Sequence, residues 1–251
     1  MNRFVSSIAL AATLMLSSAS FAADVPAGVK AAVADKGRPE ADTARDANRN
    51  PAEVVAFAGI KAGDKVADIN PGGGYFTRVF AKVVGAKGKV YGVVAASTLA
   101  TRPEAGDGMK ALQADAQYGN IAFHASDYDK LTMPEALDVA WTSDNYHDFN
   151  NRGEGFTLAM NKAIFGALKP GGTYMVIDHA AEKGSGGRDT KALHRVDPDL
   201  VKAEALAAGF TLEAESNVLA NPADDHKVGV TDGGIRGKTD QFVLKFKKPA
   251  R

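Results

Sequence analysis

The chain has 251 residues, with 30 basic and 30 acidic side chains and therefore a formal net charge of zero. This balance argues against a nucleic-acid partner, because phosphate backbones select for basic surfaces. The sequence contains no cysteine, which excludes disulfides, cysteine nucleophiles and zinc sites built on thiolates.

The first 22 residues have the pattern of a secretory signal peptide. Arg3 precedes an apolar stretch over residues 4–16, and small residues at Ser20 and Ala22 suit cleavage after Ala22. A membrane anchor needs about 20 apolar residues, so this stretch is too short to be one. We therefore predict a cleaved signal peptide over residues 1–22 and a periplasmic or secreted mature protein.

Residues 23–50 are polar and charged, and they predict an N-terminal leader followed by a helix. Arg45 and Arg49 are four residues apart in this segment, which is one helical turn. They either form a solvated helix face or lie as a lid over a ligand cleft. The main domain is expected over residues 51–251, and Pro51 opens its first helix at the position where proline is favoured.

The rest of the chain alternates between strand and helix patterns. Strands are predicted over residues 65–69, 90–94, 121–125, 136–141, 173–177, 210–216 and 241–246. Helices are predicted over residues 75–84, 106–118, 156–168 and 199–208, with a turn over residues 169–172. This alternation implies an α/β fold, a mainly parallel seven-stranded sheet with helices on both faces.

The most informative segment is residues 66–78, with the sequence VADINPGGGYFTR. A short apolar run ends in Gly72, Gly73 and Gly74, and residues compatible with a helix follow. This order predicts a buried strand, a tight turn and a helix start, where the backbone approaches a ligand and free N–H groups point at it. The spacing fits neither the dinucleotide pattern Gly-x-Gly-x-x-Gly nor the phosphate-binding P-loop.

This segment resembles motif I of the class I S-adenosylmethionine-dependent methyltransferases, in which an acidic and an apolar residue precede a glycine-rich turn. Asp68 takes the acidic position, Gly72 and Gly74 take two glycine positions, and Asn70 replaces the first glycine. The resemblance implies a Rossmann-like fold and S-adenosylmethionine as the cofactor. It assigns cofactor binding at the turn to Asp68, Asn70, Gly72, Gly73 and Gly74.

With the continuation over residues 75–77, the segment is similar to a branch of predicted methyltransferases that Gram-negative bacteria export. The similarity extends over about residues 45–249. It implies methyl transfer to a small-molecule or peptidic acceptor.

Ligands in open α/β sheets bind beyond the carboxyl ends of the strands. After the second strand, the resemblance predicts an acidic residue for the ribose hydroxyls, but residues 95–97 are Ala-Ala-Ser. After the third strand, Asp127 matches the position of an acidic residue at the adenine amino group. After the fourth strand, residues 142–149 resemble the segment that lines the methionine end and the acceptor, and Asp144 is a candidate cofactor contact there.

Methyl transfer from a sulfonium is an in-line displacement, for which the protein mainly aligns donor and acceptor. A general base is needed only if the acceptor is protonated at the working pH. His147 and His194 are the candidates, with a structural or surface role as the alternative for each. We assign Tyr146, which precedes His147, to the same catalytic segment.

Metal binding and hydrolysis are competing uses of the polar residues. A nitrogen–oxygen site could form after folding from His179, His194, His226, Asp224 and Asp225. No pair has the spacing of a recognised zinc motif, so we predict no metal site. A serine hydrolase is not favoured, because the sequence has no Gly-x-Ser-x-Gly elbow.

The missing carboxylate after the second strand and the predicted compartment keep a second hypothesis open. S-adenosylmethionine is made inside the cell, and a charged sulfonium does not cross a bilayer freely. The chain is therefore either an exported methyltransferase or a non-catalytic periplasmic protein that binds another ligand on the same fold.

Overall fold

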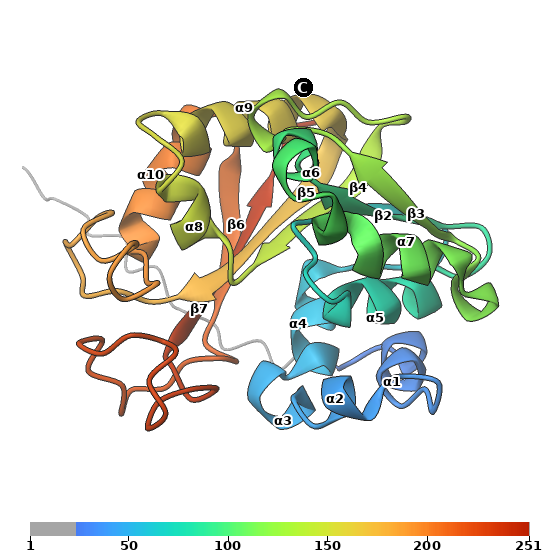
Figure 1. The fold of residues 1–251 in the computed structure, drawn as a ribbon, viewed down its shortest axis with the longest axis horizontal. Coiled ribbons are helices and arrows are strands. Elements are labelled where there is room, and N and C mark those ends of the chain that lie inside the picture. Colours follow the sequence, from blue (N-terminus) through green and yellow to red (C-terminus); the bar gives the residue numbers. More distant parts are fainter. Residues whose placement is uncertain (1–23, 251) are drawn as a thin grey trace, which may run out of the picture.

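The computed structural model describes residues 24–250, so the predicted signal peptide lies outside the described residues. Seven strands form one sheet in the order β3-β2-β1-β4-β5-β7-β6 (Figure 1). Their bounds are β1 (Lys65–Ile69), β2 (Lys89–Val94), β3 (Ile121–Ala125), β4 (Leu137–Ser143), β5 (Leu168–His179), β6 (Thr211–Ser216) and β7 (Gln241–Lys247).

The first five strands are parallel, and β7 lies antiparallel between β5 and β6. The mainly parallel seven-stranded sheet predicted from the sequence is confirmed. The direction of strand succession reverses between β1 and β4, which are hydrogen-bonded neighbours. Such a switch point leaves a crevice outside the carboxyl ends of the two strands, where ligands of α/β proteins bind.

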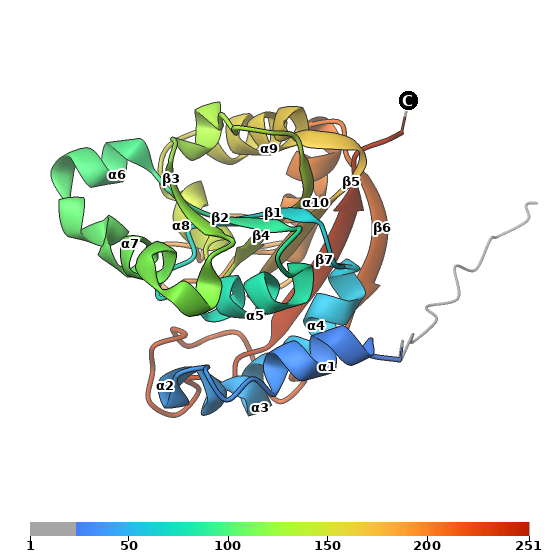
Figure 2. The same ribbon diagram turned by 90° about the vertical axis from the view of Figure 1, so that its right-hand side faces the viewer.

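Helices cover both faces of the sheet (Figure 2). One face packs against α1, α4, α5 and α7, and the other packs against α8, α9 and α10. The helices are α1 (Ala27–Val33), α2 (Glu40–Thr43), α3 (Asp46–Arg49), α4 (Pro51–Ala58), α5 (Tyr75–Val84), α6 (Ala96–Thr101), α7 (Asp107–Ala114), α8 (Tyr146–Asn150), α9 (Phe156–Ala167) and α10 (Pro198–Ala207). Short 3₁₀ turns are η1 (Pro103–Gly106), η2 (Ala116–Tyr118) and η3 (Tyr128–Lys130). None of these helices is long and apolar enough to cross a membrane.

The core between α5 and the sheet fixes the position of the glycine turn. Phe76 and Phe80 on α5 pack against Trp141 of β4, with ring centroids 4.9 and 5.0 Å apart. Trp141 and Phe80 are fully buried. Because rings of this size fill most of the space between helix and sheet, they hold the start of α5 at the end of β1.

The structure differs from the sequence prediction at the N-terminus. Residues 24–50 form three short helices where a leader and one helix were predicted. Pro26 and Pro39 stand at the N-caps of α1 and α2. Proline lacks an N–H and clashes with the preceding turn, so a continuous helix through Pro39 is excluded.

Two further differences lie near the fourth and fifth strands. Residues 169–172, predicted as a turn, belong to β5, because Gly171 donates a hydrogen bond to the carbonyl of Lys248 and Lys248 donates to Gly172. Residues 142–149 were predicted as a loop, but they contain most of α8. The strand conformation of residues 169–172 thus depends on hydrogen bonds to Lys248, about 80 residues away in the sequence.

We expect Phe80→Ala to lower the free energy of unfolding by about 3–5 kcal/mol, because it leaves a cavity between α5 and Trp141. Urea denaturation followed by the fluorescence of Trp141, the only tryptophan, measures this. Leu206→Ala is the control, because Leu206 is 51% exposed and should change stability by less than about 0.5 kcal/mol. Equal effects of the two substitutions would contradict the assigned core.

Candidate functional site

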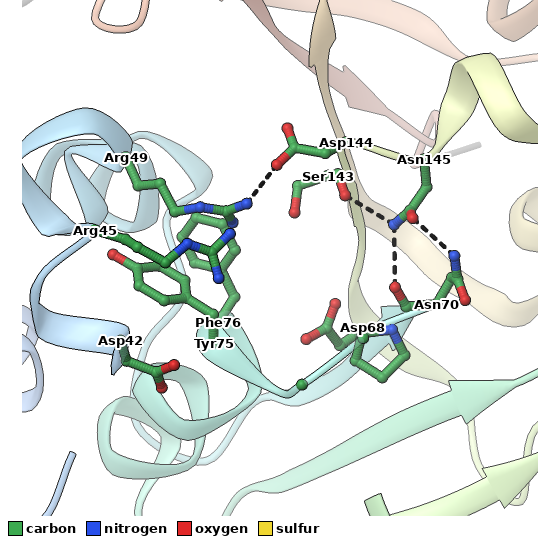
Figure 3. Close-up of a pocket in the computed structure, with 13 residues that line it drawn as sticks. Asp42, Arg45, Arg49, Asp68, Asn70, Tyr75, Phe76, Ser143, Asp144 and Asn145 are labelled. Atoms are coloured by element: carbon green, nitrogen blue, oxygen red, sulfur yellow. Dashed lines mark hydrogen bonds and ion pairs between the residues drawn. The ribbon is translucent and has the colours of Figure 1, made fainter. Parts of the chain in front are cut away.

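A polar cavity of about 200 Å³ lies at the switch point between β1 and β4 (Figure 3). Its walls come from the end of β1 and the glycine turn, the start of α5, the end of β4 and the helices α2 and α3. The lining residues are Asp42, Arg45, Arg49, Asp68, Asn70, Pro71, Gly72, Gly73, Tyr75, Phe76, Ser143, Asp144 and Asn145. The cavity therefore occupies the position at which this architecture binds ligands.

Five of the seven predicted cofactor residues line this cavity, but Gly74 and Asp127 do not. Gly74 has a φ of +81°, and a Cβ atom there would lie 2.4 Å from Leu112 and 2.8 Å from Met109. Gly74 is therefore a packing glycine that lets α7 approach the turn. A Cβ atom added to Gly72 or Gly73 would have no atom within 4 Å. The backbone of these two residues therefore faces open space.

Arg45 and Arg49 form the side of the cavity opposite the end of β4, as the lid hypothesis requires. Their guanidinium groups lie over the ring of Tyr75, at 5.3 and 4.9 Å from its centroid (Figure 3). Arg49 is ion-paired with Asp144, and the second oxygen of Asp144 accepts a hydrogen bond from Gln241 at 2.7 Å. The ion pair ties α3 to the end of β4.

Two charged groups of the cavity have no charged partner among residues 24–250. Asp42 pairs with Arg78 at 2.7 Å and Asp144 pairs with Arg49, which leaves Arg45 and Asp68. Burial and the neighbouring Arg49 lower the pKa of Arg45. An anion beside Arg45 would relieve this repulsion between two cations.

Asp68 is a buried carboxyl group at the cavity floor, 3% exposed. Burial raises its pKa to about 7, although a hydrogen bond donated by Thr77 and the charge of Arg49 lower it. The loss of hydration disfavours the charged form more than the hydrogen bonds from Thr77 and the charge of Arg49 can offset. Asp68 can therefore change its charge near neutral pH when a ligand binds.

Amide side chains join the two strands at the switch point. The Asn70 amide donates to Asn145 at 2.7 Å, and the Asn145 amide donates back to the Asn70 carbonyl at 3.1 Å. Asn70 has a φ of +57°, which asparagine tolerates better than most residues. Asn70 thus replaces the glycine of the motif without losing the turn, and its side chain cross-links β1 to β4.

The ends of β2 and β3 contribute no lining residue to this cavity among the described residues. At the end of β2, the Ala95 N–H donates to the Tyr128 hydroxyl at 3.1 Å, and this hydroxyl donates to Asn70 at 3.2 Å. Asp127 accepts a hydrogen bond from the Ser97 N–H through Oδ1 at 2.8 Å. Hydrogen bonds from the Ser97 side chain and backbone lower the pKa of Asp127, and the predicted contact with an adenine amino group remains a prediction.

The structure brings His147 and His194 together, with ring centroids 5.3 Å apart. His147 Nδ1 lies 2.8 Å from Asp178 Oδ1, and the second oxygen of Asp178 accepts from the His147 N–H at 2.8 Å. Burial lowers the pKa of His147 but the Asp178 carboxylate raises it, and the net shift is upward. Neither histidine lines the cavity.

Tyr146 is fully buried in the core between the sheet and the helices α8, α9 and α10. Its hydroxyl donates to Glu204 at 2.6 Å and accepts from Asn161 at 2.8 Å. Burial and the Glu204 charge raise the pKa of this phenol well above its usual range. The hydroxyl is engaged inside the core and does not reach the cavity, so the structure gives it a packing role.

The metal-ligand set considered from the sequence does not assemble among the described residues. Asp224 is ion-paired with the fully buried Arg195 at 2.8 Å, and His226 pairs with Asp240 at 2.9 Å. His179 Nδ1 is hydrogen-bonded to Thr239 at 2.7 Å. The Asp224–Arg195 and Thr239–His179 contacts hold the segment between β6 and β7 against β5 and the segment that follows it.

Three residues that contact the predicted site residues were not predicted from the sequence. Asp178 binds His147, Gln241 binds Asp144 and Tyr128 binds Asn70. Asp178 is the penultimate residue of β5, a strand whose apolar pattern masked it, although its position near a carboxyl end was a usable signal. Gln241 reaches Asp144 across 97 residues of sequence, and no local pattern indicates such a contact.

Residues 47–136 match the family model described as protein-L-isoaspartate(D-aspartate) O-methyltransferase. The matched segment runs from α3 to the residue before β4, so it includes the glycine turn and the ends of the first three strands. Comparison with curated proteins gives no match.

Solved structures share the fold over most of the chain. An S-adenosylmethionine-dependent methyltransferase from Aquifex aeolicus is 18% identical with a TM-score of 0.56, over 78% of this chain and 87% of that chain. The [4+2]-cyclase SpnF is 16% identical with a TM-score of 0.60, over 87% and 86%. The glycopeptide N-methyltransferase MtfA, solved with sinefungin, is 14% identical with a TM-score of 0.54, over 82% and 86%.

These similarities show that the chain has the Rossmann-like class I methyltransferase fold, as the sequence predicted. A cyclase is among the similar structures, so the fold alone does not define the reaction. The chemistry has to be argued from the cavity.

We expect Asp68→Asn to stabilise the protein at high pH relative to the wild type. The raised pKa means that the folded state keeps a proton that the unfolded state, with a pKa of about 4, has lost. Wild-type stability therefore falls as the pH rises from about 4 to about 7, and the variant lacks this loss. The unfolding free energy of the variant minus that of the wild type, measured with urea, should be about 1–3 kcal/mol larger at about pH 8 than at about pH 5. Parallel pH profiles would contradict the assignment.

Proposed function

We propose that this chain is an S-adenosylmethionine-dependent methyltransferase that acts on a small-molecule or peptidic acceptor. One observation carries the proposal: the cavity at the switch point holds one cation and one buried carboxyl, Arg45 and Asp68, without charged partners among the described residues. A zwitterionic amino acid group satisfies both, and the methionine end of S-adenosylmethionine is such a group.

The charges suggest one orientation of this group. The ligand carboxylate would lie at Arg45, where it reduces the repulsion with Arg49. The ligand ammonium would lie at Asp68, whose pKa of about 7 falls when a cation binds beside it. Both interactions form in a partly enclosed site, where charge-assisted hydrogen bonds are stronger than in water.

The adenosyl group would extend from the cavity over the glycine turn toward the ends of β2 and β3. Asp127 follows β3, and its carboxylate, held by Ser97, would accept a hydrogen bond from the adenine amino group there. The ribose has no carboxylate at the end of β2, where the sequence has residues 95–97. We therefore expect weaker cofactor binding than a site with that carboxylate would give.

The comparisons support the same cofactor. The family model that matches residues 47–136 describes a methyltransferase, and MtfA has the same fold and was solved with sinefungin, an analogue of S-adenosylmethionine. The reaction needs little covalent chemistry from the protein. Its role is to hold the methyl group in line with the attacking atom of the acceptor.

We also propose that the enzyme is exported and works in the periplasm after cleavage behind Ala22. The support is the pattern of residues 1–22. Expression of the full chain in a Gram-negative host, followed by fractionation and mass determination, tests this. A mature protein that begins at Ala23 in the periplasmic fraction is expected, and an uncleaved cytoplasmic product would contradict export.

We expect S-adenosylhomocysteine to bind the mature protein with a Kd in the micromolar range, about −8 kcal/mol, measured by isothermal titration calorimetry. Free methionine should bind at least about 100-fold more weakly, because it lacks the adenosyl contacts. Asp127→Asn keeps an acceptor for Ser97 and should weaken S-adenosylhomocysteine binding about 10-fold, the effect of one lost hydrogen bond. Asp129→Asn, on the same 3₁₀ turn, is the matched control.

Methyl transfer is tested in the same preparation with methyl-labelled S-adenosylmethionine. An isoaspartyl peptide is the first acceptor, because of the family match, and its aspartyl isomer is the control. Methionine that binds as tightly as S-adenosylhomocysteine would show that the cavity recognises an amino acid alone. That result would favour a non-catalytic binding protein over an enzyme.

A further inference from the structure

Three side chains outside the cavity converge on one point near the carboxyl edge of the sheet. His147 and Asp148 lie on α8, and His194 lies in the segment between β5 and α10. Asp148 Oδ1 is 3.6 Å from His147 Nε2 and 3.6 Å from His194 Nδ1. The three ligand atoms all lie within 4.8 Å of one another.

These separations match the edges of a metal coordination polyhedron. Zinc binds histidine nitrogen and carboxylate oxygen at about 2.0–2.2 Å, so two ligand atoms of a tetrahedral site lie about 3.3–3.6 Å apart. Both distances to Asp148 Oδ1 are at the upper end of this range. The remaining edge, between the two histidine nitrogens, is at most 4.8 Å, and the His194 side chain at one end of it is 44% exposed.

The three ligand atoms have no hydrogen-bond partner among residues 24–250, although each is a strong acceptor in its ligating form. In contrast, the nearby set of Asp144, Asp178 and His179 has its ligand atoms engaged. Asp144 binds Arg49 and Gln241, and Asp178 accepts from the N–H groups of both His147 and His179. Only the first set has its lone pairs free for a cation.

Asp178 supplies a second, independent feature of a metal site. Its Oδ1 lies 2.8 Å from His147 Nδ1, and both residues are buried. This contact places the ring proton on Nδ1 and leaves the lone pair of Nε2 directed at Asp148. Metal-binding histidines almost always have such a carboxylate or carbonyl partner, which fixes the tautomer and the ring orientation.

We propose that His147 Nε2, Asp148 Oδ1 and His194 Nδ1 bind one divalent transition-metal ion, with Zn²⁺ as the best match. Two imidazoles and one carboxylate suit zinc and its neighbours in the first transition row, and they do not suit Mg²⁺, which prefers oxygen ligands. Asp148 and His194 are about half exposed, so the ion has access from solvent and keeps an open coordination position.

This role replaces the general-base role that the sequence predicted for the two histidines, because a metal-bound nitrogen cannot accept a proton. The ion would join α8 to the segment between β5 and α10. His194 has a φ of +54°, and a bond from its ring to the metal would hold this residue in place. Because α8 follows directly after Asp144 and Asn145, the ion would also support the wall of the cavity.

The proposal is tested by titrating the metal-free mature protein with Zn²⁺ in a calorimeter, without S-adenosylmethionine. We expect one ion per chain with a Kd at or below about 1 µM. Co²⁺ should give the intense visible absorption of a tetrahedral site, and Mg²⁺ should give no heat. Because no cofactor is present in this titration, an absence of Zn²⁺ binding would not contradict the proposed methyltransferase function. Likewise, an absence of methyl transfer would not contradict the proposed metal site.

Two substitutions that remove a ligand make the test specific. His194→Asn keeps a residue that tolerates a positive φ, and Asp148→Asn changes an exposed carboxylate. Each should weaken Zn²⁺ binding at least about 10-fold and remove the rise in melting temperature that Zn²⁺ gives the wild type.

His226→Asn is the matched control, because His226 also has a positive φ, of +63°, and lies outside the three-residue set. It should bind Zn²⁺ as the wild type does. The proposal is overturned if the wild type binds no Zn²⁺ at about 0.1 mM, or if His194→Asn and His226→Asn have the same effect on binding.

Discussion

The ion pair between Arg49 and Asp144 is the interaction on which the geometry of the site depends. It joins the short helix α3 to the end of β4, across the crevice that the strand order opens. Asp144 has a φ of +56° and also binds Gln241 of β7, so three separate parts of the chain meet at one carboxylate. Both members are about one-fifth exposed, which makes the pair stronger than a surface pair and leaves it reachable by a ligand.

The ion pairs inside the cavity then determine which charged groups remain for a ligand. Because Asp144 and Asp42 each have an arginine partner, the cation of Arg45 and the carboxyl of Asp68 are the groups left for a ligand. A buried carboxyl with a pKa near 7 costs stability when it ionises. Proteins retain such groups where a function requires them, and a ligand ammonium would compensate the cost.

The carboxyl edge of the sheet thus contains two neighbouring polar regions with different chemistry. The cavity presents arginine and aspartate in a partly enclosed space and suits a zwitterion. The set formed by His147, Asp148 and His194 combines one buried and one half-exposed imidazole with a carboxylate and suits a first-row transition-metal ion. Asp178 near the end of β5 orients His147 in the second region, and the short helix α8 connects the two regions.

The sequence by itself determined the fold and the location of the cavity. Apolar runs and turns gave the strands and helices, because both depend on local periodicity, and the glycine-rich segment after β1 marked the switch point. Five of the seven residues predicted for the cofactor line the cavity, because the ends of β1 and β4 must meet at one edge of a parallel sheet.

Only the tertiary structure decided which of these polar groups have partners. The pairing of Arg49 with Asp144 spans 95 residues and that of Gln241 with Asp144 spans 97. Tyr146 and His147 are adjacent in sequence, yet one enters the core and the other faces His194. Side-chain direction on a short helix follows from packing against distant strands, and a one-dimensional pattern does not contain those contacts.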